Sequence, residues 1–379
     1  MEKRIMAILL ASTMAVGVAT TAYAAEAQTE VADTASITIA QEDPIDAAID
    51  SLDKDTYGGV YYENGILHII PVNGYETSVM QATNATLRGV NELSISVDSV
   101  ASNEAVYSMT ALEDAKAYLL ENKDELGIVG VGFNGKENAL AVYVDDGDEA
   151  TIMAESPVKN IIFRDGDVLK FSENVEALEP VDSDAIDTAG TARLTVRGGQ
   201  RCTNASGSYY STIATSAVYD YGGADETTGF LTCGHGWSVG DSIYVNGVYL
   251  GEVMTRKQSG DADYAFIESS YNSNGYMTNG DRLTGRKNPT TGMAVKCYAN
   301  VSGVQSGEVL DTSISGEWSG ISFNDLFSTD ISTASGDSGS AFANGSNIVG
   351  IMKGGLGGYD ISVGVKINNI TEDNILPSK

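Results

Sequence analysis

Histidine is scarce in this chain of 379 residues, which contains only His68 and His235. Cysteine is nearly as rare, and three scattered cysteines with one usable histidine do not make a structural zinc site. Positive charge is also short, because 22 lysines and arginines stand against 52 aspartates and glutamates, a net charge of −30. That balance argues against nucleic acid and anionic membrane surfaces as partners. We expect no metal and no organic cofactor.

The N-terminus has the pattern of an export signal. Glu2-Lys3-Arg4 is a charged start, residues 5–18 are apolar, and Ala22-Tyr-Ala24 is a cleavage signal of the A-x-A type. The apolar stretch is shorter than the about 20 residues of a spanning helix, and no later segment is long or apolar enough. We expect residues 1–24 to be removed as a signal peptide, leaving a secreted protein with no membrane contact. The alternative is an N-terminal membrane anchor.

Acidic residues are concentrated in the first half of the chain. Residues 1–190 hold 34 acidic and 10 basic residues, whereas residues 191–379 hold 18 and 12. Because the chain exceeds a typical domain of about 100–200 residues, this change in composition predicts two domains. Residues 25–60 are acidic with little periodicity, which predicts a poorly ordered segment. Residues 171–194 are acidic without apolar periodicity, which predicts a linker.

Residues 61–170 have the pattern of a small α+β domain without a constellation of catalytic groups. The aliphatic run around His68 predicts a strand, in which this histidine is a packing residue rather than a catalyst. The capping-box pattern Thr110-Ala-Leu-Glu113 predicts a helix that continues to Leu126 and ends at Gly127. Apolar runs on either side of Gly135 predict a β-hairpin. One face of the helix is predicted to contain Leu112, Ala115 and Leu119.

The motif that organises the second half is Gly336-Asp-Ser338-Gly. An acyl-transfer enzyme needs a serine on a tight turn, with glycines that let backbone N–H groups approach a developing oxyanion. The serine also needs an imidazole to take its proton, and His235 lies between two glycines after a largely apolar run. Asp263 directly precedes a strand-like run and could accept the imidazole Nδ1–H, with Asp261 as the rival.

From residue 195 onward the pattern is all-β. Short runs of Val, Ile, Tyr and Thr alternate with turns rich in Gly, Asn and Ser, which is typical of a sandwich or barrel. The clearest unit is residues 243–250, where Asn246-Gly247 predicts a tight hairpin turn. The only helix expected is a short one after Asn368.

Four motifs in this order resemble those of chymotrypsin-fold serine proteases, and most closely the secreted bacterial branch of α-lytic protease and the streptogrisins. The resemblance covers residues 195–379 and implies two six-stranded antiparallel β-barrels. It also implies a monomeric endopeptidase that cleaves protein or peptide substrates through an acyl-enzyme, with His235, Asp263 and Ser338 as its triad. The motifs are Thr232-Cys-Gly-His235, Asp263-Tyr-Ala-Phe-Ile267, Gly336-Asp-Ser-Gly339 and the run from Val349 to Gly355.

The same resemblance implies an oxyanion hole made by the N–H groups of Gly336 and Ser338. Ser332 stands where a trypsin-like enzyme carries an aspartate, which disfavours Arg or Lys in the substrate. Lys353 replaces a serine that in the family contacts the triad aspartate, and it could instead meet an acidic side chain or the substrate backbone. The implied substrate pocket comprises Ser332, Ser335, Met352, Lys353, Gly354 and Gly355, with Met352 and Gly355 as walls that suit a medium apolar side chain.

Three further assignments follow from the resemblance. Cys202 occupies the place of a family disulfide partner, and Cys233 is the available mate, which leaves Cys297 free. Asp337 serves structure in this branch by pairing with a basic residue, for which Lys296 is the candidate.

The first half occupies the position of the family's pro-regions, which assist folding and inhibit the protease until they are cut away. We expect the cut between about Asp184 and Val196. The alternative for this half is a binding module that stays attached. The alternative for the whole protein is a catalytically weak or inactive relative that binds proteins or peptides, which Lys353 and the odd number of cysteines favour. An esterase would use the same triad and is excluded only by the resemblance.

Overall fold

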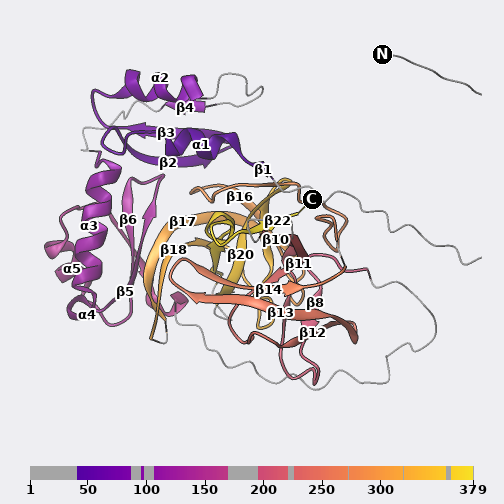
Figure 1. Cartoon of the computed structure of the whole chain (residues 1–379). Helices are drawn as coiled ribbons and strands as arrows, with labels where there is room; N and C mark the ends of the chain where they lie inside the picture. The colour runs from indigo at the N-terminus through magenta and orange to yellow at the C-terminus, as the bar shows by residue number, and fades with distance from the viewer. Residues whose placement is uncertain are drawn as a thin grey trace, which may run out of the picture. The chain divides into compact units, whose positions relative to one another are not determined.

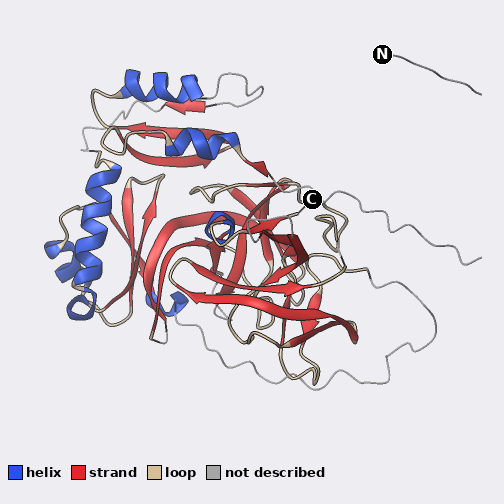
Figure 2. Ribbon diagram, viewed as in Figure 1, coloured by secondary structure: helices blue, strands red, loops and turns tan. Residues whose placement is uncertain are grey.

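The computed structural model describes residues 41–86, 95–97, 106–169, 195–220, 226–271, 273–318, 320–355 and 360–378 (Figure 1). This part of the chain is mostly β with few helices (Figure 2). The predicted signal peptide at residues 1–24 and the predicted linker at residues 171–194 lie outside the described residues. Within the described ranges, no helix is both long and apolar enough to cross a membrane.

The structure begins inside the segment that was predicted to be poorly ordered. Asp43 caps the first helix, since its Oδ1 accepts from the N–H of Ile45 at 2.9 Å, and Pro44 supplies a fixed φ in the first turn. The prediction of poor order is therefore wrong for residues 41–60, because capping and a pairing with a distant strand supply order that composition does not reveal. The elements are β1 (Gln41–Glu42), α1 (Pro44–Asp50), β2 (Tyr57–Glu63), β3 (Ile66–Pro71), α2 (Glu76–Thr86) and β4 (Ile95–Val97), of which β2, β3 and β4 form a sheet.

A second group of elements packs a helix against a hairpin. The helix face predicted from the sequence is confirmed, because its three apolar residues are at most 1% exposed. The predicted cap is wrong: Ser108, not Thr110, is the N-cap, and its Oγ accepts from the N–H of Ala111 at 3.2 Å. The hairpin around Gly135 is confirmed by the pairing of β5 with β6. The elements are α3 (Met109–Glu121), α4 (Lys123–Leu126), β5 (Ile128–Asn134), β6 (Ala139–Val144), α5 (Glu149–Glu155), β7 (Ile161–Asp165) and the 3₁₀ helix η1 (Gly166–Leu169).

One large sheet has eight strands in the order β22-β10-β11-β14-β13-β12-β8-β9. Its tight turn is the predicted one, with φ of 52° at Asn246 and 75° at Gly247, as a turn with two left-handed residues requires. The strands are β8 (Arg201–Thr203), β9 (Tyr210–Thr212), β10 (Thr215–Asp220), β11 (Glu226–Thr232), β12 (Ser242–Val245), β13 (Val248–Ser259), β14 (Ala262–Glu268) and β22 (Ile375–Pro377).

The other large sheet contains a closed ring. The pairings β16-β17-β18-β21-β20-β19 return to β16, and all of them are antiparallel. The eight strands of the first sheet instead follow a linear order from β22 to β9. The arrangement of two six-stranded barrels therefore stays a prediction. The short C-terminal helix α6 begins at Ile367, slightly earlier than predicted. The elements are β15 (Gly285–Arg286), β16 (Ala294–Tyr298), β17 (Val304–Trp318), β18 (Ile321–Thr329), β19 (Ala341–Asn344), β20 (Asn347–Gly355), β21 (Ser362–Lys366) and α6 (Ile367–Thr371).

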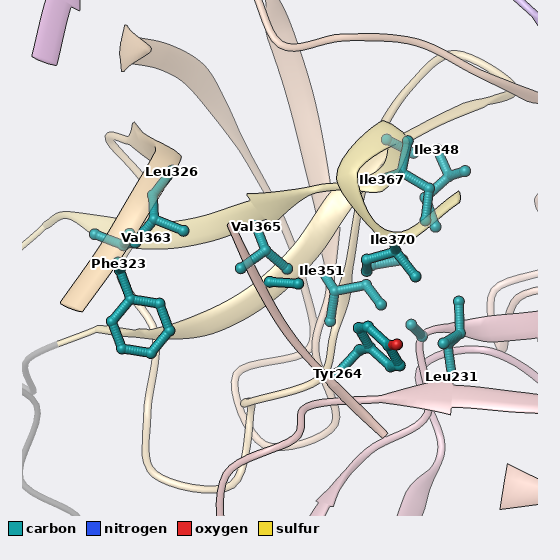
Figure 3. Packing of buried hydrophobic residues seen from close by; sticks show 14 of the residues in the cluster. Leu231, Tyr264, Phe323, Leu326, Ile348, Ile351, Val363, Val365, Ile367 and Ile370 are labelled. Atoms are coloured by element: carbon teal, nitrogen blue, oxygen red, sulfur yellow. The ribbon is translucent and has the colours of Figure 1, made fainter. Parts of the chain in front are cut away.

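The two large sheets share one hydrophobic core. Figure 3 shows Leu231 of β11 and Tyr264 of β14 beside Ile351 of β20 and Ile370 of α6. All four side chains are at most 4% exposed. Loops that leave either sheet at this junction can therefore contribute to one site.

Candidate active site

His235 follows β11 on a short turn that only glycine permits. A Cβ on Gly234 would lie 2.2 Å from the carbonyl oxygen of Lys257, so the chain passes too close for any other residue. Gly236 has φ of +79°, in the left-handed region that favours glycine. This turn fixes the backbone of His235 while its side chain stays partly exposed, at 20%.

Asp263 on β14 holds both the ring and the backbone of His235. Its Oδ2 lies 2.7 Å from His235 Nδ1, and its Oδ1 accepts from the N–H groups of Gly234 and His235 at 2.8 Å each. The carboxylate is fully buried. Asp261, the rival in the sequence, pairs with Lys257 at 2.8 Å instead. Because Asp263 accepts at Nδ1, that nitrogen carries the proton and Nε2 is left as the basic nitrogen.

Lys353 also binds this carboxylate. Its Nζ lies 3.0 Å from Asp263 Oδ2, the oxygen that His235 contacts, and 4.0 Å from the centroid of the Phe323 ring. Only 6% of the Lys353 side chain is exposed. The predicted contact of this side chain with substrate is therefore corrected, because the ammonium is directed to Asp263.

The charges of these three groups shift each other's titration. Burial raises the pKa of Asp263, but the charges of His235 and Lys353 lower it by more, and the net pKa lies well below the ordinary value. Burial lowers the pKa of His235, but interactions with Asp263 and Cys233 together outweigh this effect and raise the pKa above its usual range. Asp263 therefore stays ionised and favours a positive charge on the ring.

Ser338 lies on a turn between β18 and β19 that β9 holds in place. The N–H of Thr212 donates to the carbonyl of Ser338 at 2.8 Å, and the Thr212 hydroxyl donates to the carbonyl of Gly336 at 2.9 Å. Gly336 has φ of +92°, and a Cβ there would lie 1.9 Å from a ring carbon of Tyr210. Tyr210 and Thr212 could not be predicted as part of the site, since no local signal in the sequence connects β9 with a turn more than a hundred residues later.

The hydroxyl of Ser338 and the N–H groups of its turn differ in their hydrogen bonds. Ser338 Oγ donates to the carbonyl of Lys353 at 3.2 Å, and within the described chain it makes no hydrogen bond to the His235 ring. The N–H groups of Gly336 and Ser338 likewise donate to no described residue. A buried carboxylate, an imidazole, a serine on a tight turn and two free N–H groups are together able to carry out nucleophilic acyl transfer. Hydrogen bonds between catalytic groups are often formed only once substrate is bound.

Asp337 is a structural residue, but not through the predicted lysine. Its carboxylate is buried and accepts from the N–H groups of Val301 and Ser302, from the Ser302 hydroxyl and from the N–H of Ala334, at 2.5–3.2 Å. Lys296 is instead half exposed and pairs with Asp281 at 3.0 Å. The predicted pairing of Asp337 with Lys296 is therefore wrong, because backbone and hydroxyl donors satisfy the carboxylate.

The predicted pocket residues divide into two groups. Ser332 and Ser335 are exposed, and a Cβ on Gly355 would meet Thr333 Oγ1 at 2.5 Å, so this face admits only a small residue. Met352 is 1% exposed and packs in the interior cluster with Phe327. The prediction of Met352 as a pocket wall is therefore wrong. Gly354 is buried on the same strand.

The predicted disulfide between Cys202 and Cys233 is not formed, and all three cysteines are buried free thiols. Cys202 Sγ lies 3.1 Å from Ser211 Oγ, while Cys233 Sγ points to the carbonyl of His235 at 3.7 Å. Each thiol therefore has a separate partner. Burial raises the pKa of Cys202 to about 12, which leaves it unreactive at neutral pH. Among the described residues, no cluster of His, Cys, Asp and Glu could hold a metal ion.

Comparison with known proteins finds similarity in solved structures alone. No protein family profile and no curated protein matches the chain. The Nocardiopsis protease NAPase is 20% identical with a TM-score of 0.43, and the match covers 49% of this chain and 100% of that one. Thermobifida fusca protease A is 23% identical with a TM-score of 0.42 over 49% and 100%. An α-lytic protease homologue, N4, is 23% identical with a TM-score of 0.40 over 48% and 99%. The chain is thus similar over about half its length to bacterial serine proteases of the chymotrypsin fold.

Proposed function

We propose that the chain is the precursor of a secreted serine endopeptidase. The observation that carries this proposal is the buried Asp263 carboxylate 2.7 Å from His235 Nδ1, together with Lys353, whose Nζ binds Asp263 and whose carbonyl accepts from Ser338 Oγ. A carboxylate in this position fixes the tautomer that leaves Nε2 free to act as a base.

In the proposed reaction, Ser338 Oγ turns from the Lys353 carbonyl and attacks the carbonyl carbon of the substrate, while His235 Nε2 takes its proton. The N–H groups of Gly336 and Ser338 donate to the oxygen that becomes negative. His235 then protonates the leaving amine, which gives an acyl-enzyme on Ser338. Water, deprotonated by His235, hydrolyses that ester and restores the free hydroxyl.

Residues 41–169 are proposed as a pro-domain. Their strand β5 pairs with β17 of the other half, with Phe133 opposite Thr312 and Val131 opposite Ser315. A partly buried ion pair adds to this contact, because Arg164 Nε and Nη2 lie 2.9 and 3.1 Å from the two oxygens of the buried Asp311 carboxylate. A domain that adds a strand to a sheet of the protease half is suited to assist the folding of that half.

The test is to express the full chain beside its Ser338→Ala variant and to determine the mass and N-terminus of every product. We expect only the parent to be cut between residues 171 and 196. The activity of the variant toward peptide substrates should fall by about 10⁴-fold or more.

A matched control is Ser346→Ala, an exposed serine in the turn between β19 and β20 that belongs to no part of the proposed site, which should process as the parent does. If parent and Ser338→Ala both remain full length and inactive, the proposed endopeptidase is excluded as a self-processing enzyme. A peptide-binding protein on the same scaffold then becomes the better explanation.

A further inference from the structure

Lys353 and His235 compete for one oxygen of Asp263. Lys353 Nζ lies 3.0 Å and His235 Nδ1 2.7 Å from the same Oδ2. A cation beside the carboxylate neutralises part of the field that favours a positive imidazole. Protonation of His235 is therefore less favourable with Lys353 present than it would be with Asp263 alone.

The lysine is held where this effect is large. It is 6% exposed, Asp263 is fully buried, and the Phe323 ring faces the ammonium at 4.0 Å. Burial excludes the water and ions that screen charge at a surface. Lys353 also stands at an irregularity of its strand, since a register shift in the pairing of β20 with β21 lies between Met352 and Gly354.

Among the other ionisable groups around His235, Cys233 also raises the pKa of its ring, and this effect does not depend on Lys353. The Tyr209 hydroxyl donates to the His235 carbonyl at 2.7 Å, and Arg256 donates to the Trp237 carbonyl at 2.5 Å. The Cys233 thiol points to the same His235 carbonyl. The more distant ionisable groups contact each other: Lys257 pairs with Asp261 and Asp373, and the Tyr264 hydroxyl donates to Asp373.

We propose that Lys353 is a positioning residue that shifts the working pH range of His235 toward acid by sharing the Asp263 carboxylate. The proposal rests on the proposed function, in which His235 must be neutral to act as a base. With this lysine, His235 stays neutral at a lower pH than it would beside Asp263 alone.

The test is a direct titration of His235 in the full chain carrying Ser338→Ala, which prevents self-cutting. The chain has only two histidines, so ¹³C-labelled histidine gives two ring signals, and His68→Gln assigns them. We expect Lys353→Met to raise the midpoint of the His235 signal by about one pH unit or more. Lys353→Arg, which keeps the charge, should restore the midpoint of the parent, and the His68 signal should not move.

Two further variants serve as a substitute and as a control. Lys353→Ser has the same expected direction and replaces Lys353→Met if the latter does not fold. Lys296→Met removes a half-exposed lysine and controls for net charge. An unchanged or lowered His235 midpoint in folded Lys353→Met or Lys353→Ser would overturn the proposal.

Activity measurements separate this proposal from the proposed function. In the active chain, the acid limb of kcat/KM against pH should move upward in Lys353→Met by the same amount as the titration. A rise in KM without movement of the acid limb would mean that Lys353 contacts substrate, which contradicts the proposal. If the titration shifts as expected but no form cuts peptides, the proposed function fails and the coupling of Lys353 to His235 stands.

Discussion

At the scale of single residues, buried carboxylates that accept several donors organise the candidate site. Asp263 and Asp337 are both fully buried, and each accepts from at least two backbone N–H groups as well as from side chains. Asp263 connects His235 to β14, and Asp337 connects the turn that carries Ser338 to the loop containing Ser302. Removing either carboxylate would leave buried donors without an acceptor.

Asp337→Ala should destabilise the chain by about 3 kcal/mol, because donors from three residues lose their acceptor together. Urea unfolding of the Ser338→Ala background would measure the change. Ser302→Ala removes only one of the donors and should cost about 1 kcal/mol. Equal effects of the two variants would show that Asp337 does not organise this turn.

The sequence was sufficient to propose His235, Asp263 and Ser338 as a triad, because each stands in a short local motif, and the structure brings Asp263 to His235. It could not show the direction of Met352 or Lys353, because both lie at the irregularity in β20, which breaks the alternation of side chains between the two faces of a strand. The hydrogen-bond partners of Asp337 could not be predicted from the sequence either. Its donors are mostly backbone N–H groups, which every residue except proline possesses.

At the scale of elements, β17 is the strand on which both halves of the chain depend. It pairs with β16 and β18 in the closed ring, and with β5 of the N-terminal half. The hairpin of β5 and β6 could be predicted from its alternating apolar runs and its turn. Its partner could not, because the pairing joins residues almost two hundred positions apart and depends on Asp311 meeting Arg164, a contact without a local pattern.

Arg164→Met should destabilise the full chain by about 3 kcal/mol, because it leaves the buried Asp311 carboxylate without its cation. Urea unfolding of the Ser338→Ala background is the measurement. Lys136→Met breaks an exposed pair with Glu63 and should change the free energy of unfolding by less than about 1 kcal/mol. If Arg164→Met is as mild as this control, the ion pair does not stabilise the junction.

At the scale of the whole molecule, the N-terminal half contributes to the core of the other half. Tyr143, Val168 and Leu169 belong to the same buried cluster as Ile314 and Phe323. Composition revealed two halves through their difference in charge, but a shared core has no signature in composition. Removing the N-terminal half would therefore uncover both apolar side chains and the edge of β17.

Residues 195–379 expressed alone with Ser338→Ala should yield at least about tenfold less soluble folded protein than the full chain. Circular dichroism and gel filtration would measure the folded fraction. Deletion of residues 1–40 alone is the control, and it should leave the yield unchanged. Equal yields from residues 195–379 and the full chain would contradict a folding role for the first half.

Because β5 pairs with β17, a cut in the chain would not by itself release the N-terminal half. A cut between residues 171 and 196 breaks one covalent connection, but it leaves the strand pairing and the Arg164–Asp311 ion pair intact. The two products would remain a non-covalent complex until the N-terminal one is displaced or digested. Activation would then proceed with a lag, and its length would depend on how quickly the released protease degrades its own former half.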